Sequence, residues 1–429
     1  MTTRQPQTPG FEIKRSPWDK GILFHQRRQL DDGELLFLVN TSIDAPSAGE
    51  VVTPRQGAER WDLETGAVTP YPVATTSAGR SLEFNLPPSG SSLLFLSDKA
   101  VGAAPAGPAQ IASVISAVQA PVVRRLQPNV LTLDYVDVTV GGETRSDLYF
   151  YRAGQFAFQK NGLDRNPWDS AVQFKDELIT RRFPDTSGFT ASYKFTIAEA
   201  VPESLAIVIE RPDLYTITCN GQAVAAAKGA WWLDRAFGRI NLAAAARVGE
   251  NLVTLKAAPF TLYHELEPAY LLGGFNLRPA ERGFVIAPDR DLQLGRWNEQ
   301  GHPFYSAGVG YGERFDVPKP AGRYAVFLPS WYGSVAKVSV NGRLAGYITA
   351  PPWECDVTGE IRRGANAIEV EVIGTLKNTL GPHHGNPGLG SAWPGMFQRG
   401  PDPGPPPGAN YATVGYGLFE PFVLKQVER

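Results

Sequence analysis

Residues 337–342 read KVSVNG, and residues 215–221, about 120 positions earlier, read YTITCNG. Each stretch alternates apolar and polar residues and then ends in Asn-Gly. Alternation of this kind predicts a β-strand, and Asn-Gly predicts a two-residue hairpin turn, because both of its central residues need positive φ. The same pattern, occurring twice, predicts two copies of one β-sandwich.

The sequence around each phrase extends the repeat. In the second copy the alternating residues 311–317 come first, and Gly364-Ala365-Asn366 leads into an apolar run at 367–372. In the first copy residues 193–195 come first, and Gly249-Glu250-Asn251 leads into residues 252–255. The shared Gly-x-Asn predicts a loop before the strand that completes a sheet.

Composition agrees with an all-β chain of several domains. The 429 residues are too many for one domain and suit about three. The 44 glycines and 36 prolines favour short strands joined by turns, and no long amphipathic segments alternate with strands. A (β/α)₈ barrel needs such alternation over about 250 residues, so the sequence does not predict one.

Charge and hydropathy exclude two classes of partner. The net charge is −2 and there is no basic block, which argues against a nucleic-acid partner. No apolar run reaches the ~20 residues of a membrane span. The first residues, MTTRQP, carry no apolar signal segment. We therefore expect a cytoplasmic location unless an upstream segment has been removed.

We predict an N-terminal β-sandwich followed by two tandem jelly-roll, galactose-binding-like β-sandwiches. The expected divisions are 1–100 for the N-terminal accessory domain, 101–110 for a low-complexity linker, 111–280 for the first jelly roll and 281–429 for the second. Expected strands lie at 34–40, 81–86, 92–96, 130–138, 147–151 and 418–424, with a strand entering a turn at 61–66. Cys219 and Cys355 sit at different points of their repeats, which predicts two buried free thiols and no disulfide.

The long Gly/Pro-rich segment 381–410 is the most informative candidate for a binding loop, since loops this long usually have a function. Sugars offer apolar faces that stack on aromatic rings and hydroxyls that bond to Arg, His, Asp and Asn. The predicted ligand-binding residues combine these types: His383, His384, Trp393, Arg399, Trp331 and Trp353. If Trp393 proves to be a packing residue, the site is expected near Trp231 and Trp232 instead.

Other chemistry stays open. A glycosidase needs two carboxylates about 5–10 Å apart, and the sequence offers several candidates without selecting a pair. These candidates are Asp134 with Asp137, Glu265 with Glu267, and Glu313 and Glu354. No cofactor is certain. A structural calcium ion is conceivable, although no compact run of oxygen ligands appears, and adjacent His383 and His384 rarely share one metal ion.

The second repeat resembles the sugar-binding jelly-roll domain of family 2 glycoside hydrolases. The residues that carry this resemblance are 297–305 (WNEQGHPFY), 310–315 (GYGERF), 340–342 (VNG), Gly346, 351–353 (PPW), 356–358 (DVT) and 364–366 (GAN). The first 140 residues resemble the region that follows the catalytic barrel in large α-L-rhamnosidase-type enzymes of family 106. The matching residues there are 24–28 (FHQRR), 36–41 (LFLVNT), 62–66 (DLETG) and 129–135 (NVLTLDY).

In those enzymes the catalytic carboxylates lie on the barrel, which this chain lacks, so the resemblance implies a carbohydrate context and no catalytic residue. The function that it implies is a non-catalytic carbohydrate-binding accessory region of a glycoside hydrolase, acting alone or with a separately encoded catalytic barrel chain. Two alternatives stay open: a self-contained glycoside hydrolase with carboxylates on a β-sandwich, and a structural subunit that docks a catalytic chain. Whether the isolated chain is an enzyme, and which sugar it meets, are not decided by the sequence.

Overall fold

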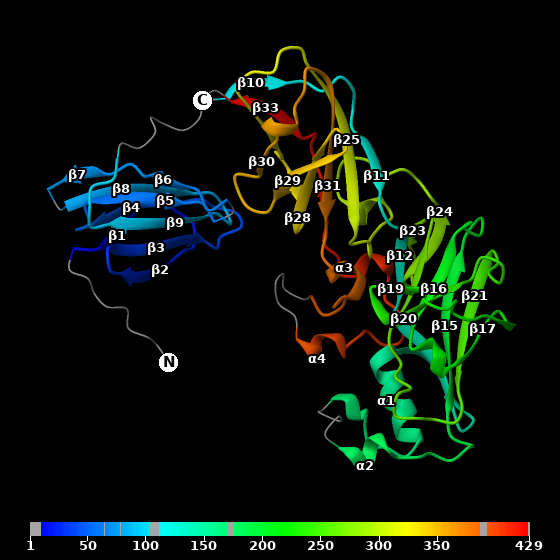
Figure 1. Ribbon diagram of the computed structural model, residues 1–429. Helices are drawn as coiled ribbons and strands as arrows, with labels where there is room; N and C mark the ends of the chain where they lie inside the picture. Colours follow the sequence, from blue (N-terminus) through cyan, green and yellow to red (C-terminus); the bar gives the residue numbers. More distant parts are fainter. Residues whose placement is uncertain are drawn as a thin grey trace.

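A computed structural model describes residues 10–63, 65–77, 79–102, 111–169, 175–386 and 393–427. The described chain is built from antiparallel sheets with a few short helices, which confirms the predicted all-β, sandwich-like fold (Figure 1). Glu64, most of the expected linker and residues 387–392 of the Gly/Pro-rich segment lie outside the described residues.

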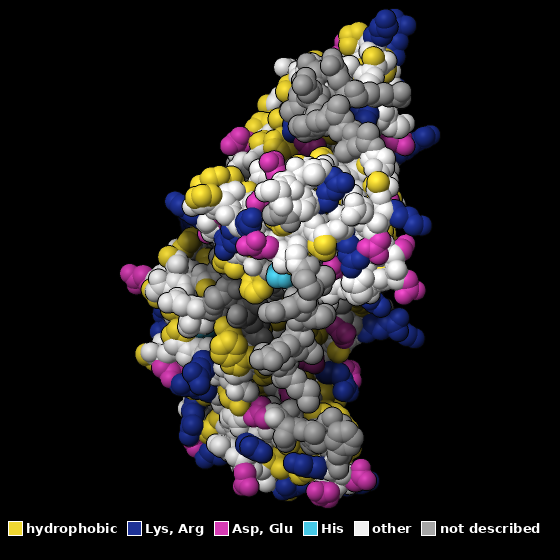
Figure 2. Space-filling view, turned by 90° about the vertical axis from the view of Figure 1, so that its left-hand side faces the viewer, with side chains coloured by type: hydrophobic (Ala, Val, Ile, Leu, Met, Phe, Trp, Pro, Cys, Tyr) yellow, Lys and Arg dark blue, Asp and Glu magenta, His cyan; other side chains and the backbone are white. Residues whose placement is uncertain are grey.

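Charge distribution and helix length are two further features of the described chain. Acidic and basic side chains are interspersed over the face shown in Figure 2, and neither sign gathers into a single field. Within the described ranges, no helix is both long and apolar enough to cross a membrane.

The N-terminal unit consists of two sheets around one core. Its strands are β1 (Glu12–Arg15), β2 (Leu23–Leu30), β3 (Gly33–Asn40), β4 (Ser47–Thr53), β5 (Gly57–Trp61), β6 (Val68–Pro70), β7 (Ala74–Thr76), β8 (Gly79–Leu86) and β9 (Ser91–Ser97). One sheet has the order β1-β4-β8-β7 and the other β2-β3-β9-β5-β6. Leu36, Leu38, Leu82 and Leu96 fill the space between them.

The middle sandwich holds the largest core. Its strands are β12 (Asn129–Leu133), β13 (Tyr135–Val140), β14 (Glu143–Tyr149), β15 (Phe189–Ile197), β16 (Leu205–Glu210), β17 (Thr216–Cys219), β18 (Gln222–Ala223), β19 (Trp231–Trp232), β20 (Asp234–Asn241), β21 (Gly249–Ala257), β22 (Ala269–Gly273), β23 (Phe275–Pro279) and β24 (Phe284–Pro288). The sheet β12-β22-β16-β20-β19 faces β14-β13-β15-β21-β17-β18, with β23 and β24 attached to the second sheet.

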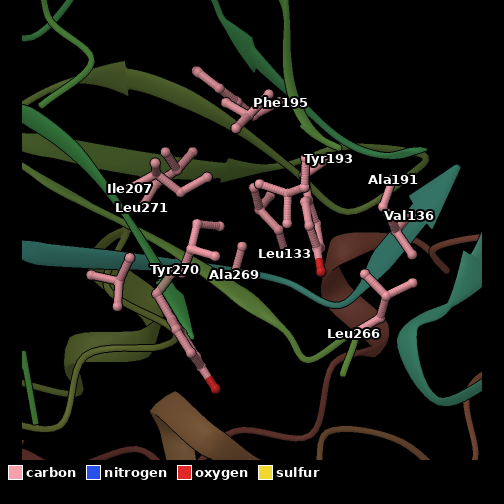
Figure 3. Packing of buried hydrophobic residues seen from close by; sticks show 14 of the residues in the cluster. Leu133, Val136, Ala191, Tyr193, Phe195, Ile207, Leu266, Ala269, Tyr270 and Leu271 are labelled. Atoms are coloured by element: carbon pink, nitrogen blue, oxygen red, sulfur yellow. The ribbon is translucent and has the colours of Figure 1, made fainter. Parts of the chain in front are cut away.

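Strand β15 shows how the sequence builds this core. Its residues alternate strictly between buried and half-buried, so that every second side chain points between the sheets. Ala191, Tyr193 and Phe195 meet Ile207 and Leu271 from the facing sheet (Figure 3). Each large apolar side chain buried in this way contributes roughly 1.5–3 kcal/mol to folding.

The last sandwich is built from two separate parts of the sequence, residues 111–125 and residues 308–427. Its strands are β10 (Ile111–Ile115), β11 (Val122–Arg125), β25 (Gly308–Val317), β26 (Arg323–Phe327), β27 (Trp331–Tyr332), β28 (Val335–Val340), β29 (Arg343–Ile348), β30 (Glu354–Asp356), β31 (Gly364–Ile373), β32 (Gly417–Leu418) and β33 (Val423–Val427). The sheet β11-β25-β31-β28-β29 packs on β10-β33-β26-β30, and β27 pairs with β32.

Short helices connect these strands. The α-helices are α1 (Phe150–Lys160), α2 (Asp176–Ile179), α3 (Lys377–Leu380) and α4 (Pro394–Phe397). The 3₁₀ turns are Pro167–Asp169, Pro212–Leu214, Trp297–Gln300, Thr358–Glu360 and Gly408–Asn410. In Figure 1, α1 and α2 lie at the end of the middle sandwich, while α3 and α4 lie between the middle and last sandwiches.

The repeated hairpin turns form as the sequence predicts. Asn220 and Gly221 have φ of 50° and 83°, and Asn341 and Gly342 have φ of 52° and 79°. Positive φ at both central positions is the requirement that Asn-Gly meets at least cost. The repeat is therefore present in the backbone as well as in the sequence.

The asparagine of each Gly-x-Asn segment is buried and holds its loop in the same way. Oδ1 of Asn251 accepts the backbone N–H of Arg247 at 2.8 Å, and its Nδ2 donates to the Arg247 carbonyl at 2.7 Å. Asn366 repeats both bonds with Arg362, at 2.9 and 2.8 Å. Both loops thus depend on one buried side chain that hydrogen-bonds the backbone of the loop.

Each of these asparagines also receives a bond from the hairpin turn. Nδ2 of Asn220 donates to Oδ1 of Asn251 at 2.9 Å, and Nδ2 of Asn341 donates to Oδ1 of Asn366 at 3.0 Å. The two sequence signals of the repeat, Asn-Gly and Gly-x-Asn, are therefore one hydrogen-bonded unit in each sandwich.

Some predicted elements differ from the structure. The run 130–138 is two strands, β12 and β13, that join different sheets, and the expected strand 418–424 is the separate pair β32 and β33. The expected strand 147–151 ends at Tyr149, where α1 begins. Helix α1 was not predicted, because its first apolar residues continue the apolar run of β14 and resemble a strand.

The expected domain division at 111–280 and 281–429 stays a prediction, but the strand pairings cross it. Strand β10 pairs with β33 and β11 with β25, so residues 111–125 belong to the sheets of the last sandwich. Conversely, β24 pairs with β15 of the middle sandwich. Cys219 and Cys355 are both buried thiols, as predicted.

Candidate functional site

An open groove of about 510 Å³ lies beside the short β27–β32 sheet of the last sandwich. We call it the aromatic groove. Its lining residues are Arg296, Trp331, Tyr332, Lys377, Ala412, Thr413, Val414, Gly415 and Phe419. The groove therefore combines three aromatic side chains, two cations and the hydroxyl groups of Tyr332 and Thr413.

A tight backbone contact sets the position of the β27–β32 pair. Trp331 pairs with Leu418 and Tyr332 with Gly417. Gly417 has φ of 150°, and a Cβ there would lie 2.2 Å from the carbonyl oxygen of Gly295. Because only glycine allows this approach, the strand that faces the groove lies directly against the segment that carries Arg296.

Neighbouring rings orient the aromatic side chains of the groove. Trp331 meets Trp353 edge-on, with ring centroids 5.3 Å apart and planes at 85°. Tyr332 is 43% exposed and stacks on Tyr416 at 5.7 Å and 14°. The Tyr416 hydroxyl is in turn 2.6 Å from the Thr375 hydroxyl. Contacts with Trp353 and Tyr416 thus fix the orientation of the Trp331 and Tyr332 rings.

The two cations of the groove differ in their surroundings. The guanidinium of Arg296 lies 5.8 Å from the centroid of the Phe419 ring and 3.5 Å from the exposed carboxylate of Glu299. The ammonium of Lys377 is half-buried and donates to the carbonyl oxygens of Pro382 at 2.6 Å and Ala412 at 2.9 Å. Burial lowers the pKa of Lys377 to about 8.

The predicted histidines lie in a buried cluster. Nε2 of His384 is 2.8 Å from a carboxylate oxygen of buried Asp134, whose other oxygen accepts the Tyr411 hydroxyl at 3.1 Å. Nε2 of His383 is 2.8 Å from the Asn378 carbonyl oxygen, and burial lowers the His383 pKa to about 4. Both side chains are at least 92% buried, so in this conformation they anchor the segment that begins at residue 381 to the middle sandwich.

The four other predicted site residues lie apart from the histidines. Trp331 and Trp353 contact each other, but only Trp331 lines the aromatic groove. Trp393 precedes α4 and is 61% exposed, and Arg399 is also exposed. The six residues therefore do not form a single lining, and their role in binding stays a prediction.

The candidate carboxylates are dispersed. Asp134 bonds to His384, whereas Asp137 pairs with Lys194 at 2.7 Å. Glu354 contacts Lys425. Glu313 points between the sheets of the last sandwich, and its Oε1 has no hydrogen-bond partner among the described residues.

Glu265 and Glu267 are the two predicted carboxylates that do lie together, as their i,i+2 spacing predicts. They line a cavity at the end of the middle sandwich with Glu210, Tyr193 and Tyr215. Burial raises the pKa of Glu265 to about 7 and that of Glu267 to about 8. The cavity measures about 10 Å³, however, which is the space that a single water molecule needs. A glycosidic bond does not fit between these carboxylates in this conformation.

Among the described residues, no group of three or more His, Cys, Asp or Glu side chains is arranged to hold a metal ion. The calcium ion considered from the sequence stays a prediction.

Sequence reasoning missed five of the groove residues that carry rings or polar groups. Tyr332 directly follows the predicted Trp331, and Arg296 directly precedes the quoted segment 297–305. No sequence motif marks the other three residues as part of a binding site: Lys377, Thr413 and Phe419. Lys377 and Thr413 reach the groove because α3 and the segment before β32 lie side by side, as the bond from Lys377 to Ala412 shows, and Phe419 directly follows β32.

No family model and no curated protein matches this chain. Among solved structures, the chain is similar to a rhamnosidase from Novosphingobium sp. PP1Y, at 16% identity and a TM-score of 0.40, over 97% of this chain and 25% of that one. It is also similar to a β-D-mannosidase from Dictyoglomus thermophilum (11% identity, TM-score 0.24, 57% of this chain and 31% of that one) and to a Bacteroides uniformis β-glucuronidase (11%, 0.21, 57% and 28%). All three are glycoside hydrolase chains, and this chain spans at most about a third of the length of each.

Proposed function

We propose that this protein binds carbohydrate in the aromatic groove and serves as a non-catalytic accessory region of a glycoside hydrolase. The observation that carries this proposal is the composition of the groove, in which the rings of Trp331, Tyr332 and Phe419 stand beside hydrogen-bond donors. The sequence resemblance to a sugar-binding jelly roll supports the same conclusion.

The groove meets the physical requirements of a pyranose ligand. A sugar ring stacks its C–H face on an aromatic face, and its hydroxyls need donors and acceptors at the edge. Here the faces of Trp331 and Tyr332 would take the ring, and Thr413, Arg296 and Lys377 would take hydroxyls. The volume of about 510 Å³ lies within the ~300–1,000 Å³ typical of small-ligand sites.

A self-contained hydrolase is less well supported. Hydrolysis requires two carboxylates on either side of the glycosidic bond. None of the residues that line the aromatic groove in the described chain is a carboxylate. Glu265 and Glu267 lie together, but their cavity has room for one water molecule rather than a sugar.

A docking function is a second candidate, because the N-terminal unit exposes apolar side chains beside a free sheet edge. Strand β2 is the edge strand of its sheet, and Phe24 on it is 59% exposed. Ile22, just before β2, is 52% exposed, and Trp18 is 58% exposed. Exposed apolar groups next to unpaired strand edges favour contact with another protein surface. Co-purification of a catalytic barrel chain with wild-type protein, and its loss on Phe24→Ser, would favour this candidate.

A glycan array followed by a turnover assay tests the main proposal. The wild-type protein should bind a subset of glycans, and Tyr332→Ala should lose that binding. Tyr347→Ala is a matched control, because Tyr347 on β29 is 45% exposed and lies outside the groove. The purified chain should release no product from aryl glycosides. Absence of all glycan binding, or turnover that Glu265→Gln abolishes, would overturn the proposal.

A further inference from the structure

The charged side chains that line the aromatic groove are both cationic, Arg296 and Lys377. We propose that the groove takes an anionic saccharide, whose uronate carboxylate or sulfate ester lies against these two cations while its ring stacks on the aromatic residues. This inference rests on the proposed function and names the ligand class for the same site.

Arg296 retains donors for such a ligand. Its side chain is 59% exposed, and its salt bridge is a single 3.5 Å contact with Glu299, itself 65% exposed. An exposed pair of this kind contributes at most about 1 kcal/mol, so an incoming anion can compete with it. A guanidinium carries five N–H donors in one plane, and two of them can bind a carboxylate or sulfate side by side.

Lys377 supplies the second charge at a defined position. Two of its three N–H donors are used by the carbonyl oxygens of Pro382 and Ala412, which leaves the third for the groove. Desolvation is what lowers its pKa, and no described carboxylate forms a salt bridge with it. His383 lies close enough to interact with this charge and is neutral near pH 7. An anionic ligand would therefore meet a half-buried cation whose charge is not yet balanced.

The arrangement suits a sugar acid better than a charged polymer without rings. In a uronic acid the carboxylate projects from the edge of the pyranose ring, so stacking and charge pairing can occur in one pose. On the face shown in Figure 2, the described acidic and basic side chains are interspersed and do not form a basic field that would track a long polyanion. The local pair of cations beside aromatic rings thus matches a single charged residue of a glycan.

Calorimetric titration with matched oligosaccharides tests the inference. The probes are oligogalacturonate, its fully methyl-esterified neutral form, sulfated κ-carrageenan oligosaccharide, neutral galactan oligosaccharide and polyglutamate. At pH 6.5 at least one acidic probe should bind about 10-fold or more tightly than its neutral counterpart, since a charge-assisted hydrogen bond contributes that much. The preferred probe identifies carboxylate or sulfate as the recognised group, and polyglutamate should not bind.

Variants assign the effect to the groove. Arg296→Gln should weaken binding of the acidic probe about 10-fold or more and binding of the neutral probe clearly less, so that the preference of the wild type for the acidic probe is lost. Arg343→Gln, an exposed arginine on β29 outside the groove, should change neither. Equal binding of neutral and acidic sugars would overturn the inference but leave the proposed function in place. Binding of polyglutamate as tight as that of the sugars would also overturn it. Failure of every sugar, neutral ones included, would overturn both.

Discussion

Glu313 should make the last sandwich less stable as the pH rises. Its side chain lies between Tyr311 and Phe315 on the inward face of β25, is 3% exposed, and has one carboxylate oxygen without a partner among the described residues. Burial raises its pKa from the ordinary 4.5 to about 7. The folded state therefore prefers the protonated acid, and ionisation of this group opposes folding.

The size of the effect follows from the shift. Below pH 4.5 the acid is protonated in both the folded and unfolded states and costs nothing. Between pH 4.5 and 7 the unfolded chain loses its proton first, and the free energy of unfolding falls. The full loss is about 3 kcal/mol, at 1.36 kcal/mol per pKa unit. Most of it, about 2–3 kcal/mol, develops between pH 5 and pH 8.

Glu313→Gln removes the titrating group while keeping its shape. In scanning calorimetry the variant should melt within a few degrees of wild type at pH 5, but roughly 5–10 °C above it at pH 8. Glu369→Gln is the control, because this carboxyl on the adjacent β31 is 39% exposed and pairs with Arg124. A Glu313→Gln melting temperature that follows wild type at both pH values would refute the burial argument.

Three further predictions concern the repeat, the histidine anchor and the groove. Asn366→Ala removes a buried amide that makes four hydrogen bonds with its loop and with the hairpin turn, and urea unfolding should show a loss of about 2–4 kcal/mol. The equivalent Asn251→Ala should lose a similar amount, and a loss below 1 kcal/mol in both would contradict the role of the Gly-x-Asn unit. Asp134→Ala removes the partner of His384 and Tyr411 and should lower the free energy of unfolding by about 3–5 kcal/mol in the same assay. Asp213→Ala, at an exposed position, should lower it by under 0.5 kcal/mol. Equal losses in the two variants would show that the histidine cluster does not anchor its segment. Binding of an acidic sugar should weaken as the pH rises through about 8, because Lys377 loses its proton there. A Lys377→Gln variant should lose this pH dependence. An affinity of the wild type that is unchanged from pH 7 to 9.5 would show that Lys377 does not contact the sugar.

The sequence predicted those elements of the fold whose conformation is set by a few neighbouring residues. Asn-Gly requires positive φ at Asn341 and Gly342 whatever the rest of the chain does, and alternation in residues 311–317 assigns their faces without knowledge of the partner strand. Helix α1 lacked such a signal, because Phe150 directly follows Tyr149 and the change from strand to helix is decided by packing. Local patterns thus identified the sandwiches but not every element between them.

The candidate site was harder to predict, because its residues meet only in three dimensions. Arg296, Trp331, Lys377 and Phe419 come from four separate segments, and only Trp331 belongs to a recognisable aromatic pair. Composition pointed to the histidines of the segment 381–410, but it could not show that His384 meets Asp134, 250 residues away. The segment 381–410 is rich in polar and aromatic residues in the sequence, but in the structure its first residues, with His383 and His384, are buried.

Calorimetric titration of the preferred glycan from the array, against Trp331→Ala and Trp393→Ala, tests the central claim most directly. Loss of a stacking ring costs roughly 2 kcal/mol or more, which corresponds to at least ~30-fold in affinity. Melting temperatures measured alongside, and Tyr332→Ala as a second groove variant, separate lost binding from lost folding. The account predicts at least ~30-fold weaker binding for Trp331→Ala and Tyr332→Ala and wild-type affinity for Trp393→Ala. Wild-type affinity in both groove variants, with loss in Trp393→Ala, would contradict it.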